Sequence, residues 1–160
     1  MATQSSLSKP VPASDAELAA RPSLTLTRRF NAAPEKVYAA WADPQRLVQW
    51  FGPASVKEGS VKAEIDLRVG GSYRISFDAN GQYNQVGGVY REVVPNQRLV
   101  FTWAWHSTPE RESLVTISIK PEGSGSLITF HHAQVVDAKA RDNHERGWTE
   151  FLAKLEDYLA

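Results

Sequence analysis

Cysteine is absent from this chain of 160 residues, and several chemistries are excluded with it. There is no disulfide, no thiolate nucleophile, no cysteine-ligated zinc and no iron–sulfur cluster, which fits a protein of the reducing cytoplasm. Net charge is lacking too, because 18 Lys and Arg residues balance 18 Asp and Glu residues. A chain without an overall field does not concentrate polyanions, so we expect neither nucleic acid nor an anionic membrane as its partner.

Long hydrophobic runs are also missing. No segment approaches the roughly 18 to 20 apolar residues of a membrane-spanning helix, and residues 1–22 contain no continuous apolar stretch of the kind found in secretory signals. We therefore expect no membrane insertion and a cytoplasmic location. Hydrophobic residues make up 42% of the chain and charged residues 22%. These are ordinary globular values, and the length suits one domain.

The chain divides near residue 22. Residues 1–22 are rich in Ser, Ala and Pro, which predicts a disordered tail in which residues 15–20 could form one marginal helical turn. From residue 23 apolar and polar side chains alternate as in a half-buried strand. Two short helices follow, each opened by a proline in the first helical position, at Ala33-Pro34 and Asp43-Pro44. The folded domain is predicted to span residues 23–160.

Alternating patterns separated by turn residues predict six further strands, at residues 61–67, 72–78, 82–94, 98–106, 111–120 and 126–133. Asn80-Gly81 is typical of a type I′ hairpin turn, and Gly87-Gly88 predicts a bulge or a close approach of two backbones. From residue 137 apolar residues recur at three- and four-residue steps, which predicts a long amphipathic helix. Gly147 within it costs about 1 kcal/mol relative to alanine, so we expect it to lie against another element.

This order of elements predicts an α+β domain in which one curved antiparallel sheet is covered by a long C-terminal helix. A single helix is too narrow to fill a sheet that curls. We therefore expect a gap between the helix and the sheet.

Five segments in succession resemble one known family: TRRFNAAPEKVYAAWADPQRLVQWFGP, DLRVGGSYRI, GGVYREVVPNQRLVFTWAW, VTISIKPEGSGSLITFHH and ERGWTEFLAKLEDYLA. Their order is similar to that of bacterial single-domain proteins that resemble the C-terminal domain of the activator of heat-shock-protein-90 ATPase, within the START-like, or SRPBCC, superfamily. The resemblance implies a helix-grip fold, whose cavity holds an apolar ligand in many relatives. It also implies a setting in the stress response, with a chaperone as a candidate partner.

Three functions are compatible with these residues. The first is a START-like domain that binds a small hydrophobic ligand without a cofactor. The second is a co-chaperone resembling the ATPase activator, although the chain matches only that protein's C-terminal domain and residues 1–22 leave little room for a partner-binding module. The third is an enzyme of the cyclase or aromatase kind that uses His132 with Tyr90 or Glu92. The oligomeric state is left open.

The usual signatures of hydrolases, zinc proteases, dinucleotide enzymes and P-loop proteins do not occur. His131 and His132 are neighbours on a strand and face opposite sides, so they do not form a shared metal site. If Ile128 and Phe130 face the core, His132 faces it too, and a histidine simply hydrogen-bonded in the core is the ordinary interpretation of such a residue.

The candidate ligand-binding residues are mainly aromatic, because rings present a large apolar area with few rotors. Trp50 and Phe51 are expected at the cavity mouth, whereas Trp41 is assigned to the core. Tyr90 and Glu92 share one face of their strand, and the pattern leaves open whether that face points inward. The full set is Trp50, Phe51, Tyr73, Phe77, Tyr90, Glu92, Phe101, Trp103, Trp105, His132, Trp148 and Phe151.

Overall fold

The computed structural model describes residues 13–160. The predicted order of strands and helices is confirmed, and no helix of the described part is long and apolar enough to cross a membrane. In chain order the elements are α1 (Asp15–Ala20), β1 (Leu24–Phe30), α2 (Pro34–Ala42), α3 (Pro44–Leu47), β2 (Lys62–Ile65), β3 (Ser72–Ala79), β4 (Gln82–Val94), β5 (Arg98–Trp105), the 3-10 turn η2 (Pro109–Arg111), β6 (Ser113–Glu122), β7 (Gly125–Ala133) and α4 (Ala138–Leu159).

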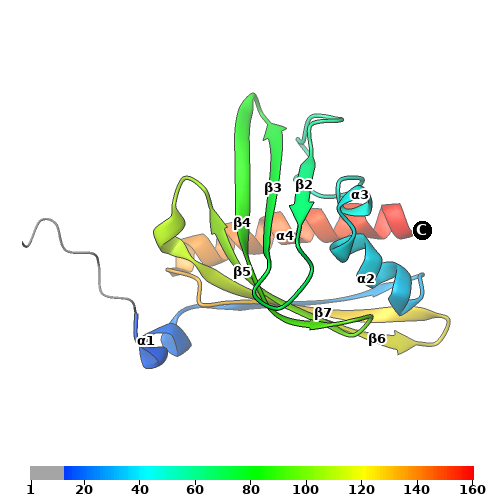
Figure 1. Ribbon diagram of the computed structural model, residues 1–160, viewed down its shortest axis with the longest axis horizontal. Helices are drawn as coiled ribbons and strands as arrows, with labels where there is room; N and C mark the ends of the chain where they lie inside the picture. Colours follow the sequence, from blue (N-terminus) through cyan, green and yellow to red (C-terminus); the bar gives the residue numbers. More distant parts are fainter. Residues whose placement is uncertain (1–12) are drawn as a thin grey trace, which may run out of the picture.

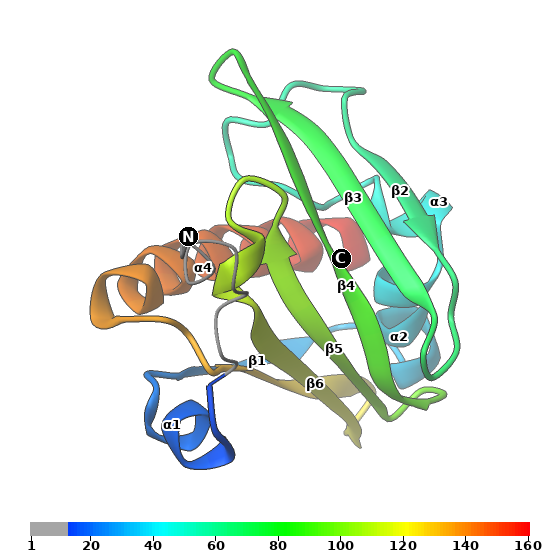
Figure 2. The same cartoon turned by 60° about the vertical axis from the view of Figure 1, so that its left-hand side comes forward.

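The seven strands form one sheet in the order β1-β7-β6-β5-β4-β3-β2, and all neighbouring pairs are antiparallel. The sheet curls so strongly that β3 and β4 stand almost upright in Figure 1 while β1 and β7 run across the view. Helix α4 crosses the concave side, and the turned view in Figure 2 shows the sheet bending around it. The predicted α+β helix-grip architecture is therefore confirmed.

A tight turn and a close backbone contact, both predicted from the sequence, join the central strands. Asn80 and Gly81 have positive φ angles of 53° and 73°, which is the backbone that a type I′ hairpin requires. A Cβ on Gly88 would overlap the carbonyl oxygen of Thr102. The close approach predicted at this glycine pair is thus present, and it lets β4 lie against β5.

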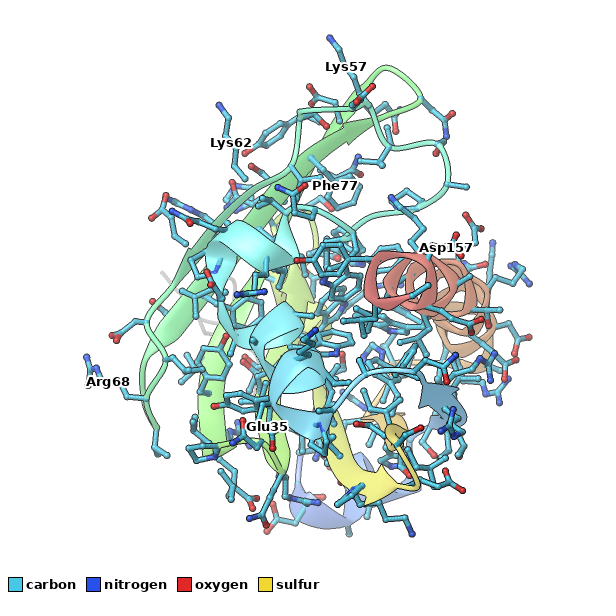
Figure 3. All side chains as sticks on the ribbon, turned by 90° about the vertical axis from the view of Figure 1, so that its right-hand side faces the viewer. Glu35, Lys57, Lys62, Arg68, Phe77 and Asp157 are labelled. Atoms are coloured by element: carbon cyan, nitrogen blue, oxygen red, sulfur yellow. The ribbon has the colours of Figure 1, made fainter. Side chains whose placement is uncertain are left out.

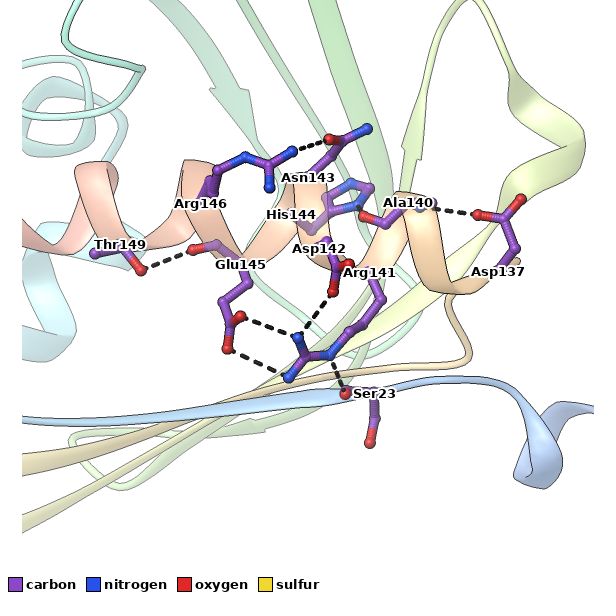
Figure 4. Close-up of polar contacts among 10 residues, drawn as sticks. All are labelled: Ser23, Asp137, Ala140, Arg141, Asp142, Asn143, His144, Glu145, Arg146 and Thr149. Atoms are coloured by element: carbon purple, nitrogen blue, oxygen red, sulfur yellow. Dashed lines mark hydrogen bonds and ion pairs between the residues drawn. The ribbon is translucent and has the colours of Figure 1, made fainter.

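Helix α4 is fixed at its start. The Asp137 side chain accepts a hydrogen bond of 2.8 Å from the Ala140 backbone amide, as a helix N-cap does. Arg141 donates through Nε to the carbonyl oxygen of Ser23 at 3.0 Å and also pairs with Glu145 at 2.9 Å (Figure 4). The bond to Ser23 joins the first turn of α4 to the residue that precedes β1.

The surroundings of Gly147 differ from those predicted. A Cβ placed on it would meet no atom within 4 Å, so no neighbouring element requires a glycine here. The prediction of a close approach was wrong because the helix borders open space at this position.

The predicted tail falls partly outside the described residues, which begin at residue 13. Within them, α1 has a capping box between Ser14 and Glu17 and buries none of its residues. The first backbone bond to the domain is at Pro22, whose carbonyl oxygen accepts from the Val135 amide at 3.1 Å. The boundary of the tail at residue 22 stays a prediction.

Figure 3 looks along α4 and shows side chains filling the space between this helix, α2 and the sheet. Trp41 on α2 belongs to this core, as predicted, and is 4% exposed. Its ring lies 4.7 Å from that of Trp50 and 6.2 Å from that of Trp148. The labelled charged side chains, among them Lys57 and Arg68, lie on the outside.

Candidate functional site

The space on the concave side of the sheet is filled at one end and open at the other. Beneath α2 and α3 the side chains leave a void of about 20 Å³, which is room for about one water molecule. Beneath the first half of α4 lies a cleft of about 730 Å³, a size typical of small-molecule sites. Among residues 13–160, the open space between the helix and the sheet thus lies at the N-terminal end of α4.

The cleft has an aromatic floor. Phe77, Trp103 and Trp105 line it from the sheet, and Trp148 and Phe151 line it from α4. The ring centroids of Trp103 and Trp148 are 4.7 Å apart, so the rings of the two walls meet. Further lining residues come from the β3–β4 hairpin, from the segment around η2, and from the stretch of α4 that includes Gly147.

Five of the predicted binding residues thus line the cleft, and four others surround the small void instead: Phe51, Tyr73, Tyr90 and Phe101. The Tyr73 hydroxyl donates to the carbonyl oxygen of Thr102 at 2.6 Å, and burial raises the pKa values of Tyr73 and Tyr90 above the ordinary range. These rings stabilise the core where α2 and α3 close the sheet.

Two predictions need correction. Trp50 and Phe51 were expected at the cavity mouth, but each is 1% exposed, and the indole nitrogen of Trp50 donates to the Ala40 carbonyl oxygen. Tyr90 and Glu92 do not share a face, because the register between β4 and β5 shifts between them. Tyr90 points inward, while Glu92 is half exposed and pairs with Arg98 at 3.0 Å.

His132 is wholly buried, with both ring nitrogens engaged. Its Nδ1 accepts from the indole nitrogen of Trp148 at 3.0 Å, and its Nε2 lies 2.6 Å from the Ser113 hydroxyl. Because an indole only donates, the neutral ring must carry its proton on Nε2 and donate to Ser113, whose hydroxyl donates onward to the Trp103 carbonyl oxygen.

Burial, together with the neighbouring His144 and His131, holds the pKa of His132 well below its ordinary value. The ring is thus a neutral, fully bonded core group. No nitrogen is free for proton transfer or for a ligand, which removes the geometric support for a catalytic role of His132.

Sequence reasoning missed His144, which lines the cleft. Its Nδ1 lies 2.8 Å from the Ala140 carbonyl oxygen. Since a carbonyl oxygen only accepts, Nδ1 carries the proton, and burial lowers the pKa of this histidine and keeps it neutral near pH 7. The spacing of four residues to Trp148 was the available signal, because it places both on one helix face.

A curved antiparallel sheet that grips one long helix, with a cleft between the two, defines the START-like class of domains. The chain belongs, within that class, to the family described as Activator of Hsp90 ATPase homolog 1-like protein, which matches residues 31–160. A comparison with curated proteins found no match.

Solved structures agree with this assignment. AHSA1 (SPO3351) from Silicibacter pomeroyi is 31% identical with a TM-score of 0.71, and the match covers 86% of this chain and 97% of that one. Protein CV1439 from Chromobacterium violaceum is 29% identical with a TM-score of 0.74, covering 86% and 96%. Protein NE0264 from Nitrosomonas europaea is 25% identical with a TM-score of 0.71, covering 86% and 93%.

Proposed function

We propose that this domain binds a small hydrophobic molecule in the cleft between α4 and the sheet. The observation that carries the proposal is the cleft of about 730 Å³ with aromatic rings on two of its walls. Concave sites of this size bury most of the surface of a small ligand, and the aromatic rings offer it apolar contact area beside the polar side chains that also line the cleft. The START-like fold is compatible with such a role.

Gly147 gives a direct test, because a side chain added there would project into the cleft. We expect the apolar fluorophore N-phenyl-1-naphthylamine to bind saturably to the wild-type protein, with a rise in its fluorescence. The Gly147→Phe variant should bind the probe at least about tenfold more weakly, since the new ring occupies the space. The Gly147→Ala variant is the matched control and should bind like the wild type, because its methyl group meets no atom within 4 Å.

Thermal unfolding of all three proteins shows whether the variants are folded. Equal affinity in folded Gly147→Phe protein would place the probe elsewhere and contradict the proposal. Absence of saturable binding to the wild type, with this probe and with flat polycyclic and acyl-chain ligands, would contradict it as well.

A chaperone partner is the second candidate, favoured by the description of the matched family as related to an activator of Hsp90 ATPase. The distinguishing measurement is the ATPase rate of a purified Hsp90 with and without this protein. Stimulation that persists in Gly147→Phe would favour a surface contact with the chaperone over ligand binding in the cleft.

A further inference from the structure

The chain between α3 and β2 passes from the helix to the sheet beside the cleft, and we call its residues 53–57 the strap. The first half of the strap is bonded to α4. The Ala54 amide donates to Oε1 of Glu150 at 2.9 Å, and Nζ of Lys154 donates to the Pro53 carbonyl oxygen at 3.3 Å. Glu150 and Lys154 are four residues apart, so both bonds start from one face of the helix.

The second half of the strap is bonded to β3. The Lys57 amide donates to the Asp78 carbonyl oxygen at 2.7 Å, and Val56 forms an antiparallel bridge with Ala79. Asp78 and Ala79 are the last two residues of β3 before the hairpin turn to β4. The strap therefore joins α4 to the tip of the β3–β4 hairpin.

This connection borders the cleft. Pro53 and Ser55 of the strap line the cleft, as do Glu150 on α4 and Ala79 at the end of β3. Across residues 13–160, no hydrogen bond or ion pair joins α4 directly to β3 or β4. A short chain that is fixed at both ends limits how far the two walls can separate.

The start of the strap is anchored independently of Glu150. Phe51 is buried, and its ring centroid lies 4.8 Å from that of Phe151. Gly52 follows with a φ angle of 113°, which lets the chain turn from this buried ring toward the exposed Ala54. Loss of the Glu150 carboxylate should therefore release the strap from α4 and leave the domain folded.

We propose that the strap sets the width of the ligand cleft, with Glu150 as the positioning residue that holds it on α4. A wall that is fixed before the ligand arrives favours ligands whose thickness matches the gap, whereas a loose wall adapts to thicker ones. Loss of the Glu150 bond should thus shift the preference of the cleft toward thicker ligands. This inference rests on the proposed function.

Two alcohols with ten carbon atoms each test the proposal, because 1-naphthol is flat and 1-adamantanol is globular. Their affinities are measured by displacement of N-phenyl-1-naphthylamine. We expect Glu150→Ala to raise the affinity for 1-adamantanol relative to 1-naphthol by about threefold over the wild-type ratio, because the released wall yields to the thicker molecule.

Two further variants are controls. Glu150→Gln keeps a side-chain oxygen that accepts from the Ala54 amide and should keep the wild-type ratio. Glu156→Ala removes an exposed carboxylate of α4 that does not line the cleft, and it should keep the ratio too. Thermal unfolding shows whether each variant is folded. Should Glu150→Ala not fold, Glu150→Asp takes its place, because its carboxylate is one methylene short of the Ala54 amide.

Amide hydrogen exchange reports on the strap without any ligand. In Glu150→Ala the Ala54 amide should exchange about tenfold faster than in the wild type, because it has lost its acceptor. The Lys57 amide, which donates to Asp78, should keep its rate. An unchanged rate at Ala54 would show that Glu150 does not hold the strap and would overturn the inference.

The binding results distinguish this inference from the proposed function. If the fluorophore binds and the ratio of the two alcohols is the same in wild type and Glu150→Ala, ligand binding stands and the role of the strap is overturned. A shift of the ratio in Glu150→Gln equal to that in Glu150→Ala would overturn it as well. If the fluorophore does not bind saturably to the wild type, the proposed function fails and this inference fails with it.

Discussion

Trp148 connects the helix, the sheet and the buried histidine. Its ring lies 4.4 Å from Phe130, 4.7 Å from Trp103 and 5.1 Å from Phe151, measured between centroids. Its indole nitrogen also gives His132 the bond that fixes the tautomer of that ring. One side chain therefore supports both the core and the floor of the cleft.

We expect Trp148→Ala to lower the free energy of unfolding by about 3 to 5 kcal/mol, because a large buried ring is removed from surroundings that cannot collapse fully. The loss also leaves Nδ1 of His132 without its donor. Urea unfolding followed by circular dichroism measures the change. The Trp148→Phe variant keeps a ring and loses the indole nitrogen. Its free energy of unfolding should lie between those of the wild type and Trp148→Ala. A Trp148→Ala variant as stable as the wild type would show that this face of α4 is not packed in solution.

The alternation of apolar and polar residues along single strands predicted several side-chain orientations correctly. It failed at the register shift in β4. Tyr73 and Phe77 both point toward the core. His132 points toward the core and its neighbour His131 points to the other side of the sheet, as a period of two requires. Tyr90 and Glu92 were wrongly assigned to one face, because the register shift between them inverts the period. A bulge of this kind depends on the pairing of two strands, which one strand's pattern does not contain.

At the scale of whole elements, helix α4 contains a residue that its own geometry does not favour. Gly147 costs about 1 kcal/mol relative to alanine in a helix interior, and no neighbouring atom requires it. The bare backbone at this point widens the cleft. The composition of the helix is thus less than optimal for stability where it borders open space.

Gly147→Ala should raise the free energy of unfolding by about 0.5 to 1 kcal/mol, because the helix gains propensity without a clash. Thermal or urea unfolding measures the difference. Gly88→Ala provides the contrast, since its methyl group would overlap the Thr102 carbonyl oxygen and should destabilise the protein. If Gly147→Ala were destabilised too, α4 would lie closer to its neighbours than the structure indicates.

Elements were predictable because their boundaries are set by local chemistry. Asn80-Gly81 ends one strand and Asp137 begins α4, and each acts through bonds within a few residues. The division of the candidate residues between cleft and core was not predictable. It depends on how α2 and α3 close one half of the sheet, which brings Phe51 close to Phe77 and Phe151.

At the scale of the whole molecule, hydrogen bonds at Pro22 and Ser23 connect the start of the sheet to residues near α4. The carbonyl oxygen of Pro22 accepts from the Val135 amide, and that of Ser23 accepts from the Arg141 side chain, more than 100 residues later in the chain. Helix α1, which precedes them, buries none of its residues. Residues 15–20 therefore contribute little to the contacts that the structure describes.

A protein lacking residues 1–20 should unfold at nearly the same temperature as the full chain, because the sequence of this segment has no periodic apolar face and its helix α1 buries none of its residues. Differential scanning calorimetry measures the two transitions. As a comparison, removal of residues 1–23 also takes away the carbonyl groups of Pro22 and Ser23 and should lower the melting temperature. A drop of more than a few degrees in the shorter deletion would mean that residues before 21 pack on the domain.

The pairing of β1 with β7 bears on how the protein is made. Thr25 and His131, which are bonded across these strands, are separated by 106 positions in the chain. On the ribosome, β1 emerges first and has no sheet edge to join until β7 has left the exit tunnel. Helix α4 emerges later still, so the apolar concave face stays uncovered until this helix has left the tunnel. The sheet of this domain therefore closes late in its synthesis, and the interval before closure is when the exposed apolar face needs most protection from aggregation.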